Sequence, residues 1–414
     1  MRLLFVHQNF PGQYRHLAAH YARQPGNQVA AIGEARHLRP FPGVKLFGYR
    51  NEQPEGENAF EDPVVKAIRR GRNVARGAAQ LARAGWVPDV VFTHIGWGEA
   101  LFLKDVFPAA KVLLYSEFFY RARGADLGFD PEFPASADKV LRLRVMNAPL
   151  LMSLDASDAG MAPTRWQQRQ FPAVYASRLN VIHDGVDTDL VAPSNSVEKE
   201  ELVTYAARNL EPYRGFHSFM RALPEIQKRR PNARIVIVGG DEVSYSPRLP
   251  AGETYRARML RELEGKINTE KIQFTGRIGY ADYLRILQRS SVHVYLTYPF
   301  VLSWSLLEAM AAGCLVVGSR TPPVEEVIRD GENGLLTDFF SSEGIADRVD
   351  YALSHRQELQ PLREKARQTV VERYDLKRVC LPAQVNLVEK VLAAGRPAAL
   401  HATQYASRPR RLAR

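Results

Sequence analysis

The chain has 414 residues, of which 45% are hydrophobic and 24% charged. This composition excludes a largely disordered protein, and the length exceeds one typical hydrophobic core, which predicts two or three globular domains. The net charge is +11, but five arginines and no acidic residue lie in residues 396–414, so the rest of the chain carries +6. We expect this basic tail to be a mobile end.

The two cysteines, Cys314 and Cys380, are too few for a disulfide framework and lack the spacing of metal ligands. We expect both to be buried small apolar residues of a protein in the reducing cytosol. The opening "MRLLFVHQNFPG" is too weakly apolar for a signal peptide, and no stretch approaches the roughly 18 apolar residues of a membrane span. We therefore predict a cytoplasmic protein, with peripheral attachment to the inner face of the membrane as the alternative.

In chain order, short aliphatic and β-branched runs alternate with segments of helical length. Such near-continuous apolar strands are typical of parallel sheets covered on both faces by helices. The predicted fold class is therefore α/β, with two doubly wound, Rossmann-like domains. The expected strands are "RLLFVHQ", "QVAAIG", "VKLFGY", "DVVFTH", "KVLLYSE" and "LNVIHDG" in the first half, then "ELVTYAAR", "ARIVIVGG", "KIQFTG", "VHVYLTY", "CLVVGS" and "GLLTDF" in the second.

A helix expected over residues 64–85 holds six basic residues and no acidic one. At 100° per residue, one face carries Arg69, Arg72, Arg76 and Arg83, and the opposite face carries Val64, Ala67, Val74, Ala78, Leu81 and Ala82. The first interpretation is a helix packed on a sheet with a solvated basic face; the alternative is contact with an anionic membrane surface. Neither this helix nor the tail interleaves the aromatic residues of a base-stacking surface, so no nucleic-acid partner is predicted.

The best domain boundary lies in "DTDLVAPSNSVEKEELV", where a Pro-Ser-Asn-Ser loop and a charged run precede a fresh strand. We predict an N-terminal domain over residues 1–190 and a C-terminal domain over residues 191–375. A last helix over residues 376–395 has no strand after it to cover, which leaves open a return to the N-terminal domain. Its apolar positions include Val379, Leu381, Val385, Val388 and Leu392.

In doubly wound sheets, ligands lie beyond the carboxyl ends of the strands, where the strand order switches. Each half opens with a strand that runs into a donor-rich loop, "RLLFVHQNFPGQY" and "VTYAARNLEPYRGF". Two such crevices facing each other would form an interdomain cleft. Arg208 and Arg214 flank the turn of the second loop, and two guanidiniums at the mouth of a sheet suit a diphosphate, although two solvated loop arginines are the alternative.

The segment "PFVLSWSLLEAMAAG" (299–313) predicts a helix whose free N-terminal N–H groups would attract a phosphate. Glu308, one turn into this helix, could then reach the hydroxyls of an attached sugar. The alternative is a capping box, in which Ser305 and Glu308 satisfy each other's backbone N–H groups, with Gly313 ending the helix.

His94 and Glu117 both end strands of the first half and are expected to point toward the same cleft. For His94, a polar role at the strand end is the alternative to a catalytic one. The chain has no Walker A loop, no complete G-x-G-x-x-G fingerprint and no G-x-S-x-G elbow, and its His and carboxylate spacings predict no metal site and no bound cofactor.

The segment "LTYPFVLSWSLLEAMAAGCLVVGSRTPPVEEVIRDGENGLL" closely resembles the nucleotide-sugar-binding segment of retaining glycosyltransferases of family 4, which have the two-domain GT-B fold. "RNLEPYRGFHSFMRALPEI" looks like the family's Arg…Lys-Gly segment, "VIHDGVDTDLVAP" like its Asn-Gly-Val-Asp junction, and "RLLFVHQNFPGQYRHLA" like its opening strand and glycine loop. The resemblance extends to about residue 395. It implies that the first domain faces the acceptor and the second binds a nucleotide sugar.

By this resemblance, Arg208 and Arg214 would hold the donor diphosphate, with Arg214 where the family usually has lysine. Glu308 matches the second glutamate of the family's E-x7-E motif, which hydrogen-bonds the nucleotide ribose. Phe300 stands at the first glutamate, which normally touches the donor sugar. The other positions that the resemblance places beside the donor are Gly12, Gly276, Arg277, Leu302, Ser303 and Trp304, and Glu117 lies near where many members have an acceptor-side histidine.

The resemblance implies transfer of a sugar from a nucleoside diphosphate donor, a UDP- or GDP-sugar, to a glycan, glycolipid or other hydroxyl acceptor. Retention of the anomeric configuration and independence of a metal ion are expected from the same family. Two alternatives stay open at this point: a catalytically weak protein of the same fold that binds nucleotide or glycan without transfer, which Phe300 motivates, and a sugar-nucleotide epimerase.

Overall fold

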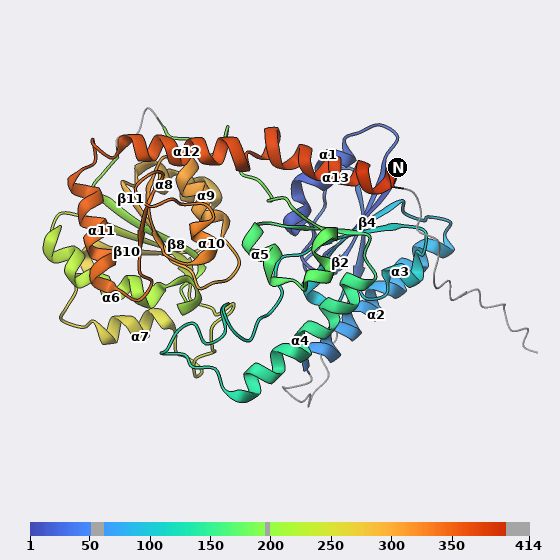
Figure 1. The fold of residues 1–414 in the computed structure, drawn as a ribbon, viewed down its shortest axis with the longest axis horizontal. Helices are drawn as coiled ribbons and strands as arrows, with labels where there is room; N and C mark the ends of the chain where they lie inside the picture. The colour runs from blue at the N-terminus through green and yellow to red at the C-terminus, as the bar shows by residue number, and fades with distance from the viewer. Residues whose placement is uncertain (51–61, 195–198, 395–414) are drawn as a thin grey trace, which may run out of the picture.

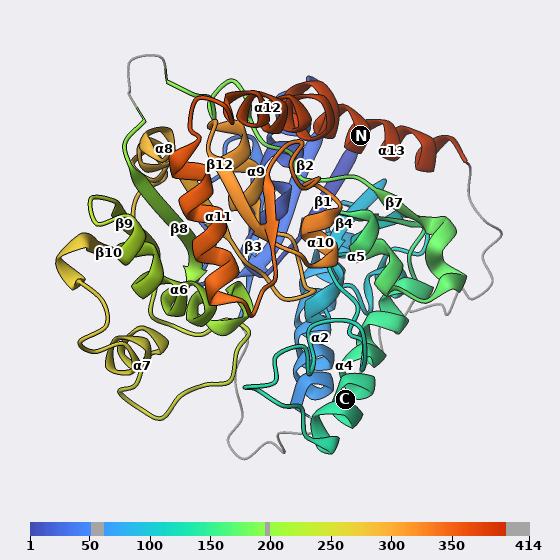
Figure 2. The same cartoon turned by 60° about the vertical axis from the view of Figure 1, so that its left-hand side comes forward.

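Two parallel sheets lie side by side in the structure, a computed structural model that describes residues 1–50, 62–194 and 199–394 (Figures 1 and 2). The basic tail expected over residues 396–414 lies outside the described residues. The first sheet has the strand order β3-β2-β1-β4-β5-β6-β7. Its strands are β1 (Arg2–Val6), β2 (Gln28–Glu34), β3 (Val44–Tyr49), β4 (Val90–His94), β5 (Lys111–Tyr115), β6 (Ala159–Ala162) and β7 (Leu179–Val181).

The second sheet has the order β10-β9-β8-β11-β12-β13, and every described strand pair in both sheets is parallel. In each sheet the order reverses beside the first strand, at the β1/β4 pair and the β8/β11 pair. The predicted α/β class with two doubly wound domains is therefore confirmed. The strands are β8 (Leu202–Asn209), β9 (Arg234–Gly240), β10 (Ile272–Gly276), β11 (Val292–Tyr295), β12 (Leu315–Ser319) and β13 (Leu335–Thr337).

Helices cover both faces of each sheet, which explains why the central strands are apolar almost throughout. Residues 3–6 of β1 and all of β4 are buried. The helices of the first half are α1 (Arg15–Ala22), α2 (Asp62–Arg83), α3 (Leu103–Val106), α4 (Ala137–Asp155) and α5 (Arg165–Gln170). Those of the second half are α6 (Phe216–Arg229), α7 (Tyr255–Glu262), α8 (Tyr280–Arg289), α9 (Trp304–Ala311), α10 (Pro322–Glu325), α11 (Ser342–Ser354), α12 (Gln360–Tyr374) and α13 (Leu381–Ala393).

The predicted basic helix is α2, and seven of the ten residues assigned to its two faces lie as expected, while Val64, Arg69 and Ala82 are half-buried. Ala67, Val74, Ala78 and Leu81 are buried, whereas Arg72, Arg76 and Arg83 are exposed. No helix in the described part of the chain combines the length and the apolar character of a membrane span. Both cysteines are free and buried, as predicted.

The C-terminal segment crosses from one domain to the other. Helix α12 packs against α9 of the second domain, and α13 packs against α1 of the first (Figure 1). Leu387 and Val388 of α13 share a hydrophobic cluster with Leu3 and Phe5 of β1. The helix predicted over residues 376–395 begins as a π-helical turn, Leu376–Cys380, before α13. Proline at position 382 explains the interruption, because its nitrogen cannot donate a helical hydrogen bond.

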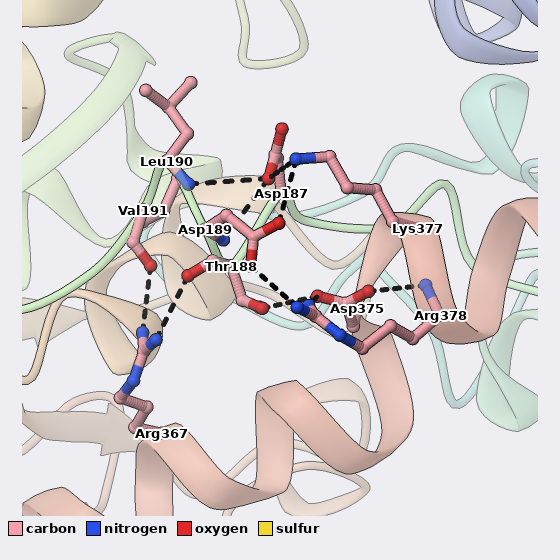
Figure 3. A network of polar contacts seen from close by, with 9 residues as sticks. All are labelled: Asp187, Thr188, Asp189, Leu190, Val191, Arg367, Asp375, Lys377 and Arg378. Carbon is pink, nitrogen blue, oxygen red and sulfur yellow. Dashed lines mark hydrogen bonds and ion pairs between the residues drawn. The ribbon is translucent and has the colours of Figure 1, made fainter.

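A polar network joins this crossing segment to the linker between the sheets (Figure 3). The fully buried Asp375 accepts hydrogen bonds from the Thr188 hydroxyl and from Arg378, at 2.6 Å from the backbone N and 3.0 Å from Nη1. Burial would raise the pKa of Asp375, but these hydrogen bonds outweigh it and hold the pKa below its ordinary value. Arg367 donates to the carbonyl oxygens of Thr188 and Val191, at 3.0 Å each.

Gly185 lies where the linker crosses this segment. Its φ is +91°, and a Cβ there would come within 2.7 Å of the Leu376 Cα. A side chain at position 185 would therefore force the linker and the crossing segment apart. Two constraints, one polar and one steric, fix the linker between the domains.

We expect Asp375→Ala to lower the free energy of unfolding by about 3 kcal/mol, because it leaves Thr188 and Arg378 without their buried acceptor. The matched control is Asp189→Ala, whose half-exposed carboxylate pairs with Lys377 and Arg378 at 2.9 Å. Exposed pairs of this kind contribute less than about 1 kcal/mol. Urea denaturation followed by circular dichroism measures both. Equal losses in the two variants would contradict a special role for Asp375.

Candidate functional site

A cavity of 470 Å³ lies between the two domains, beyond the carboxyl ends of β8 and β9 and beside the start of α9. This is the place that the strand-order rule predicts for a ligand in a doubly wound sheet. Of the residues predicted from the sequence to bind the donor or take part in catalysis, eight line it: Glu117, Arg208, Arg214, Arg277, Leu302, Ser303, Trp304 and Glu308. Its first-domain wall is made by Gln13, Tyr115, Glu117, Pro163, His183 and Asp184.

Two arginines bring positive charge to this cavity without a carboxylate beside either. Arg208, at the end of β8, forms no hydrogen bond or ion pair with any described residue, and its side chain is exposed. Arg214 ends the short turn Pro212–Arg214 and donates from Nη1 to two neutral oxygens, the Thr297 hydroxyl at 3.0 Å and the Val301 carbonyl at 2.8 Å. Two uncompensated guanidiniums favour an anionic ligand such as a diphosphate.

Arg277 differs from these two arginines because its charge is already paired. Its Nη2 donates to Glu242 at 2.7 Å and to the Asn209 side chain at 3.0 Å. Gly276 precedes it with a φ of +65°, a backbone conformation that favours glycine. Gly276 does not line the cavity, whereas Arg277 and Ile278 do.

The start of α9 faces the same cavity. Its N-cap residue is Ser303, and no described side chain caps the helix, although the Ser303 backbone N donates to the Tyr295 hydroxyl at 2.8 Å. The following residues, Trp304 and Ser305, line the cavity. An uncapped helix start adds N–H donors and a partial positive charge to the two guanidiniums.

Glu308 reaches the cavity from the second turn of α9. Its Oε1 accepts a hydrogen bond from the Tyr280 hydroxyl at 2.8 Å. Burial raises the pKa of Glu308, and the hydrogen bond from Tyr280 offsets only part of this rise. The capping-box alternative is not realised, because α9 begins before Ser305 and the Ser305 hydroxyl bonds to that of Ser303 at 3.0 Å. Gly313 does follow the helix end, with a φ of +76°, as predicted.

Glu117 forms the first-domain wall with two histidines behind it. His94 Nε2 lies 3.4 Å from Glu117 Oε2, and the His7 and His94 rings meet edge-to-face at 5.6 Å. His94 Nδ1 accepts a hydrogen bond from the Gly96 backbone N, so the proton of a neutral His94 sits on Nε2, toward Glu117. Burial, then the neighbouring His94, lower the pKa of His7 to about 3.

Burial would raise the pKa of Glu117, but the neighbouring His94, 3.4 Å away, outweighs it and keeps the pKa below its ordinary value. Glu117 is therefore an ionised carboxylate on the cavity wall at neutral pH. His94 itself lies behind that wall and does not line the cavity.

Asp184 is a cavity residue that the sequence interpretation missed. Its Oδ2 accepts hydrogen bonds from the Trp304 indole N at 2.7 Å and the Tyr115 hydroxyl at 2.9 Å, which ties the interdomain linker and β5 to the start of α9. Burial raises its pKa to about 7. The available signal was its place in "VIHDGVDTDLVAP", where the resembling family has asparagine.

Two further expected donor contacts lie away from the cavity. Gly12 has a φ of +48°, and a Cβ there would come within 2.7 Å of the His7 ring, so glycine is needed for packing; its neighbour Gln13 lines the cavity instead. Phe300 is 6% exposed, and its ring packs against Phe118 with centroids 4.6 Å apart. An apolar ring gains free energy by this burial; one side of the ring lies under the Arg214 guanidinium, and the ring lines an adjoining cavity instead of the main one.

Within residues 1–50, 62–194 and 199–394, no group of three or more His, Cys, Asp or Glu side chains is arranged to hold a metal ion. Metal independence stays a prediction. Among the described residues, the arginines that line the cavity are Arg208, Arg214 and Arg277.

Comparisons with known proteins place this geometry in a family. The description "Glycosyl transferase family 4 group" matches residues 25–191, and "Glycosyl transferases group 1" matches residues 187–369. The chain belongs to the family 4, group 1 glycosyltransferases. The two matches meet at the linker that carries Asp184.

Sequence matches to curated relatives extend over part of this glycosyltransferase. It is 23% identical to a D-inositol 3-phosphate glycosyltransferase of Corynebacterium glutamicum over 187 residues, 42% of each chain. It is 27% identical to a phosphatidyl-myo-inositol mannosyltransferase of Mycobacterium tuberculosis over 199 residues, 47% of each chain. The matches to these curated relatives thus span less than half the length of each.

Solved structures show that the likeness of fold extends over nearly the whole chain. Anabaena Alr3699/HepE in complex with UDP superposes with a TM-score of 0.67, covering 94% of this chain and 100% of that one, at 16% identity. The same protein in complex with UDP-glucose gives a TM-score of 0.64. The two domains therefore have the GT-B arrangement.

We expect the stability difference between Asp184→Asn and the wild type to depend on pH. The folded-state pKa of Asp184, about 7, lies above its ordinary 3.8, so the folded protein holds a proton that the unfolded chain releases between these values. The wild type thus loses stability as pH rises from about 4 to about 7, and a neutral amide at this position does not. The Tm of the variant, relative to the wild type, should increase between pH 5 and pH 8. The exposed Asp105→Asn serves as control, and a pH-independent difference for Asp184→Asn would contradict the assignment.

Proposed function

We propose that this chain transfers a sugar from a nucleoside diphosphate donor to a hydroxyl acceptor, with retention of the anomeric configuration and without a metal ion. One observation carries the proposal: Arg208 and Arg214, neither facing a carboxylate partner among the described residues, line one cavity with the uncapped start of α9. The leaving group of such a reaction is a nucleoside diphosphate, whose charge grows as the sugar–phosphate bond breaks. Fixed cationic and N–H groups stabilise that growing charge without reorganisation.

The remaining cavity residues fit a nucleoside beside the diphosphate. The Glu308 carboxylate, held by Tyr280, would accept hydrogen bonds from ribose hydroxyls, and Arg277 and Ile278 would border the base. The raised pKa of Asp184, about 7, reduces the negative charge next to the diphosphate. The binding of UDP and UDP-glucose by the structural neighbour supports a UDP-sugar as the donor, with a GDP-sugar as the second candidate.

The acceptor enters from the first-domain side, where Glu117 is the ionised carboxylate. In a front-face reaction, the acceptor attacks from the side that the diphosphate leaves, and a departing phosphate oxygen takes the acceptor proton. Glu117 would then orient the acceptor hydroxyl by hydrogen bonding, and no covalent sugar–enzyme bond forms. The configuration of the product, measured by proton NMR of the anomeric signal, tests retention directly.

We expect Arg214→Ala to lower kcat/KM for transfer by about 30- to 1000-fold, corresponding to the roughly 2 to 4 kcal/mol of transition-state stabilisation that one such donor supplies. A thermal-shift screen over UDP-, GDP-, ADP- and CMP-sugars first identifies the donor. Arg285→Ala, which removes an exposed arginine of α8, is the control and should retain wild-type activity. Wild-type activity in Arg214→Ala would contradict the diphosphate assignment. Nucleotide binding without turnover on any donor and acceptor would favour a binding protein.

We also propose that the first domain attaches peripherally to an anionic membrane surface on the cytoplasmic side, which would present lipid-linked glycan acceptors. The exposed arginines of α2 support this, together with exposed apolar side chains on α2 and its neighbour α4. Ile68 on α2 is 39% exposed, and Leu141 and Met152 on α4 are 61% and 53% exposed. Apolar side chains beside cations are typical of interfacial helices.

Liposome flotation tests the membrane proposal. The wild type should float with vesicles of phosphatidylcholine and phosphatidylglycerol but not with phosphatidylcholine alone, since the attraction is electrostatic. Replacing Arg72, Arg76 and Arg83 by glutamine should abolish flotation. Replacing Arg248, Lys266 and Lys271 of the second domain changes the net charge equally and should not. Equal losses in the two triple variants would contradict attachment through α2.

A further inference from the structure

A second cavity, of 390 Å³, adjoins the proposed donor cavity and is also closed by both domains. The first domain supplies the segment between β5 and α4 together with the first turns of α4. The second domain supplies Tyr213, Tyr298, Phe300 and the loop 244–247. Tyr245 lines both cavities, so a molecule in the second one would lie next to a donor bound in the first.

The walls of this cavity are pinned by hydrogen bonds across the domains. Asp130 of the first domain is 3% exposed and accepts hydrogen bonds from the Tyr298 hydroxyl at 2.6 Å and from His217 Nε2 at 2.9 Å. Nearby, Glu132 pairs with Arg221 at 2.7 Å. The segment before α4 is therefore fixed on the second domain, and the cavity is preformed.

The loop carrying Tyr245 is fixed in a similar way. Glu211, 1% exposed, accepts hydrogen bonds at Oε2 from the backbone N atoms of Ser244, Tyr245 and Ser246, at 3.1, 2.9 and 2.9 Å. A carboxylate that gathers three N–H groups holds the loop in one conformation. The Tyr245 ring then packs against Phe300 with centroids 4.9 Å apart.

Two polar atoms in this cavity have no hydrogen-bond partner among the described residues, in contrast to the Asp130 carboxylate. Asp126 is 6% exposed, and its Oδ2 accepts from the Tyr213 hydroxyl at 2.9 Å, but its Oδ1 has no hydrogen-bond partner among the described residues. The buried Nε of Arg142 likewise finds no partner in the described part of the chain. Burial also raises the pKa of Asp126. An unsatisfied buried polar atom costs about 1 to 3 kcal/mol, a cost that a bound hydroxyl would remove.

Six aromatic rings complete the cavity: Tyr120, Phe133, Tyr213, Tyr245, Tyr298 and Phe300. Aromatic faces suit the C–H faces of a pyranose ring, while a few placed polar groups select its hydroxyls. Lys139 and Arg142 add two cations, and neither forms an ion pair with a described residue. Phe300, which lies where the family has a sugar-reading glutamate, thus becomes part of the wall of a second, aromatic site.

We propose that this cavity binds the acceptor, and that the acceptor is an anionic saccharide. Its ring lies against Tyr245 and Phe300, a hydroxyl donates to Asp126 Oδ1, and a carboxylate or phosphate substituent pairs with Arg142 and Lys139. That the bound saccharide is the acceptor of a transfer reaction rests on the proposed function. The site itself, as a place that binds an anionic saccharide, does not depend on that function.

Titration calorimetry and ligand-observed NMR on the full chain, with UDP present, test the site. The probes are methyl β-D-glucuronide and glucose 6-phosphate, which distinguish a carboxylate from a phosphate, with methyl β-D-glucoside as the neutral match. We expect at least one anionic probe to bind about tenfold more tightly than the glucoside, and Arg142→Gln to remove that difference. Asp126→Asn, which keeps the side-chain shape, should weaken all probes that bind.

Arg144→Gln removes an exposed arginine two residues along α4 that does not line the cavity, and it should bind the probes as the wild type does. Failure of both anionic probes to bind, or equal losses in the Arg142 and Arg144 variants, would overturn the assignment. Thermal shift by the nucleotide separates the two proposals. If a nucleotide binds but no probe does, only the acceptor-site proposal is contradicted. If a probe binds but no nucleotide does, the donor assignment is contradicted and the saccharide site is supported.

Discussion

Everything in the site depends on how the linker between the two sheets is held. Its chain passes Gly185, where there is no room for a side chain against Leu376, and the buried Asp375 carboxylate fastens it to the crossing segment between α12 and α13. Asp184, next to that glycine, reaches Trp304 at the start of α9 and Tyr115 at the end of β5. The position of one domain against the other is therefore set beside the cavity and not at a distance from it.

The surroundings of each ionisable side chain decide where charge lies in the main cavity. The positive charges of Arg208 and Arg214 are not neutralised by any carboxylate among the described residues, and Arg214 donates only to neutral oxygens. Burial raises the pKa of Asp184 and of Glu308 near them, whereas His94 keeps the pKa of Glu117, on the opposite wall, below its ordinary value. The result is a cavity with unneutralised positive charge on its second-domain side and an ionised carboxylate on its first-domain wall.

Phe300 connects the two cavities in an unexpected way. From the sequence alone, Phe300 indicates the loss of a polar contact, because an apolar ring stands where the family has a carboxylate that binds the donor sugar. In the structure its guanidinium neighbour, Arg214, lies 5.9 Å from its ring centre, and its ring closes the adjoining aromatic cavity with Tyr245 and Tyr213. Phenylalanine at position 300 therefore removes one polar contact and forms part of the wall of the second cavity. We interpret this departure from the family pattern as an adaptation to the ligand proposed for that cavity.

The alternation of apolar runs with helical segments determined the two doubly wound sheets, because burial on both faces of a parallel strand leaves a local pattern in the sequence. The strand-end rule and charge chemistry likewise located Arg208, Arg214, Glu117 and Glu308 from the sequence. Asp184, Asp126 and Arg142 were not found this way: only its place in the family-like junction marked Asp184, and nothing in the neighbouring residues marked the other two. Their roles come from partners that are distant in sequence: Trp304 bonds Asp184, Tyr213 bonds one oxygen of Asp126, and Arg142 faces a cavity that exists only because both domains close it. Sequence determined which groups could carry charge, and only the tertiary structure decided which of them are satisfied, because hydrogen-bond partners and burial depend on packing between segments that are far apart in the chain.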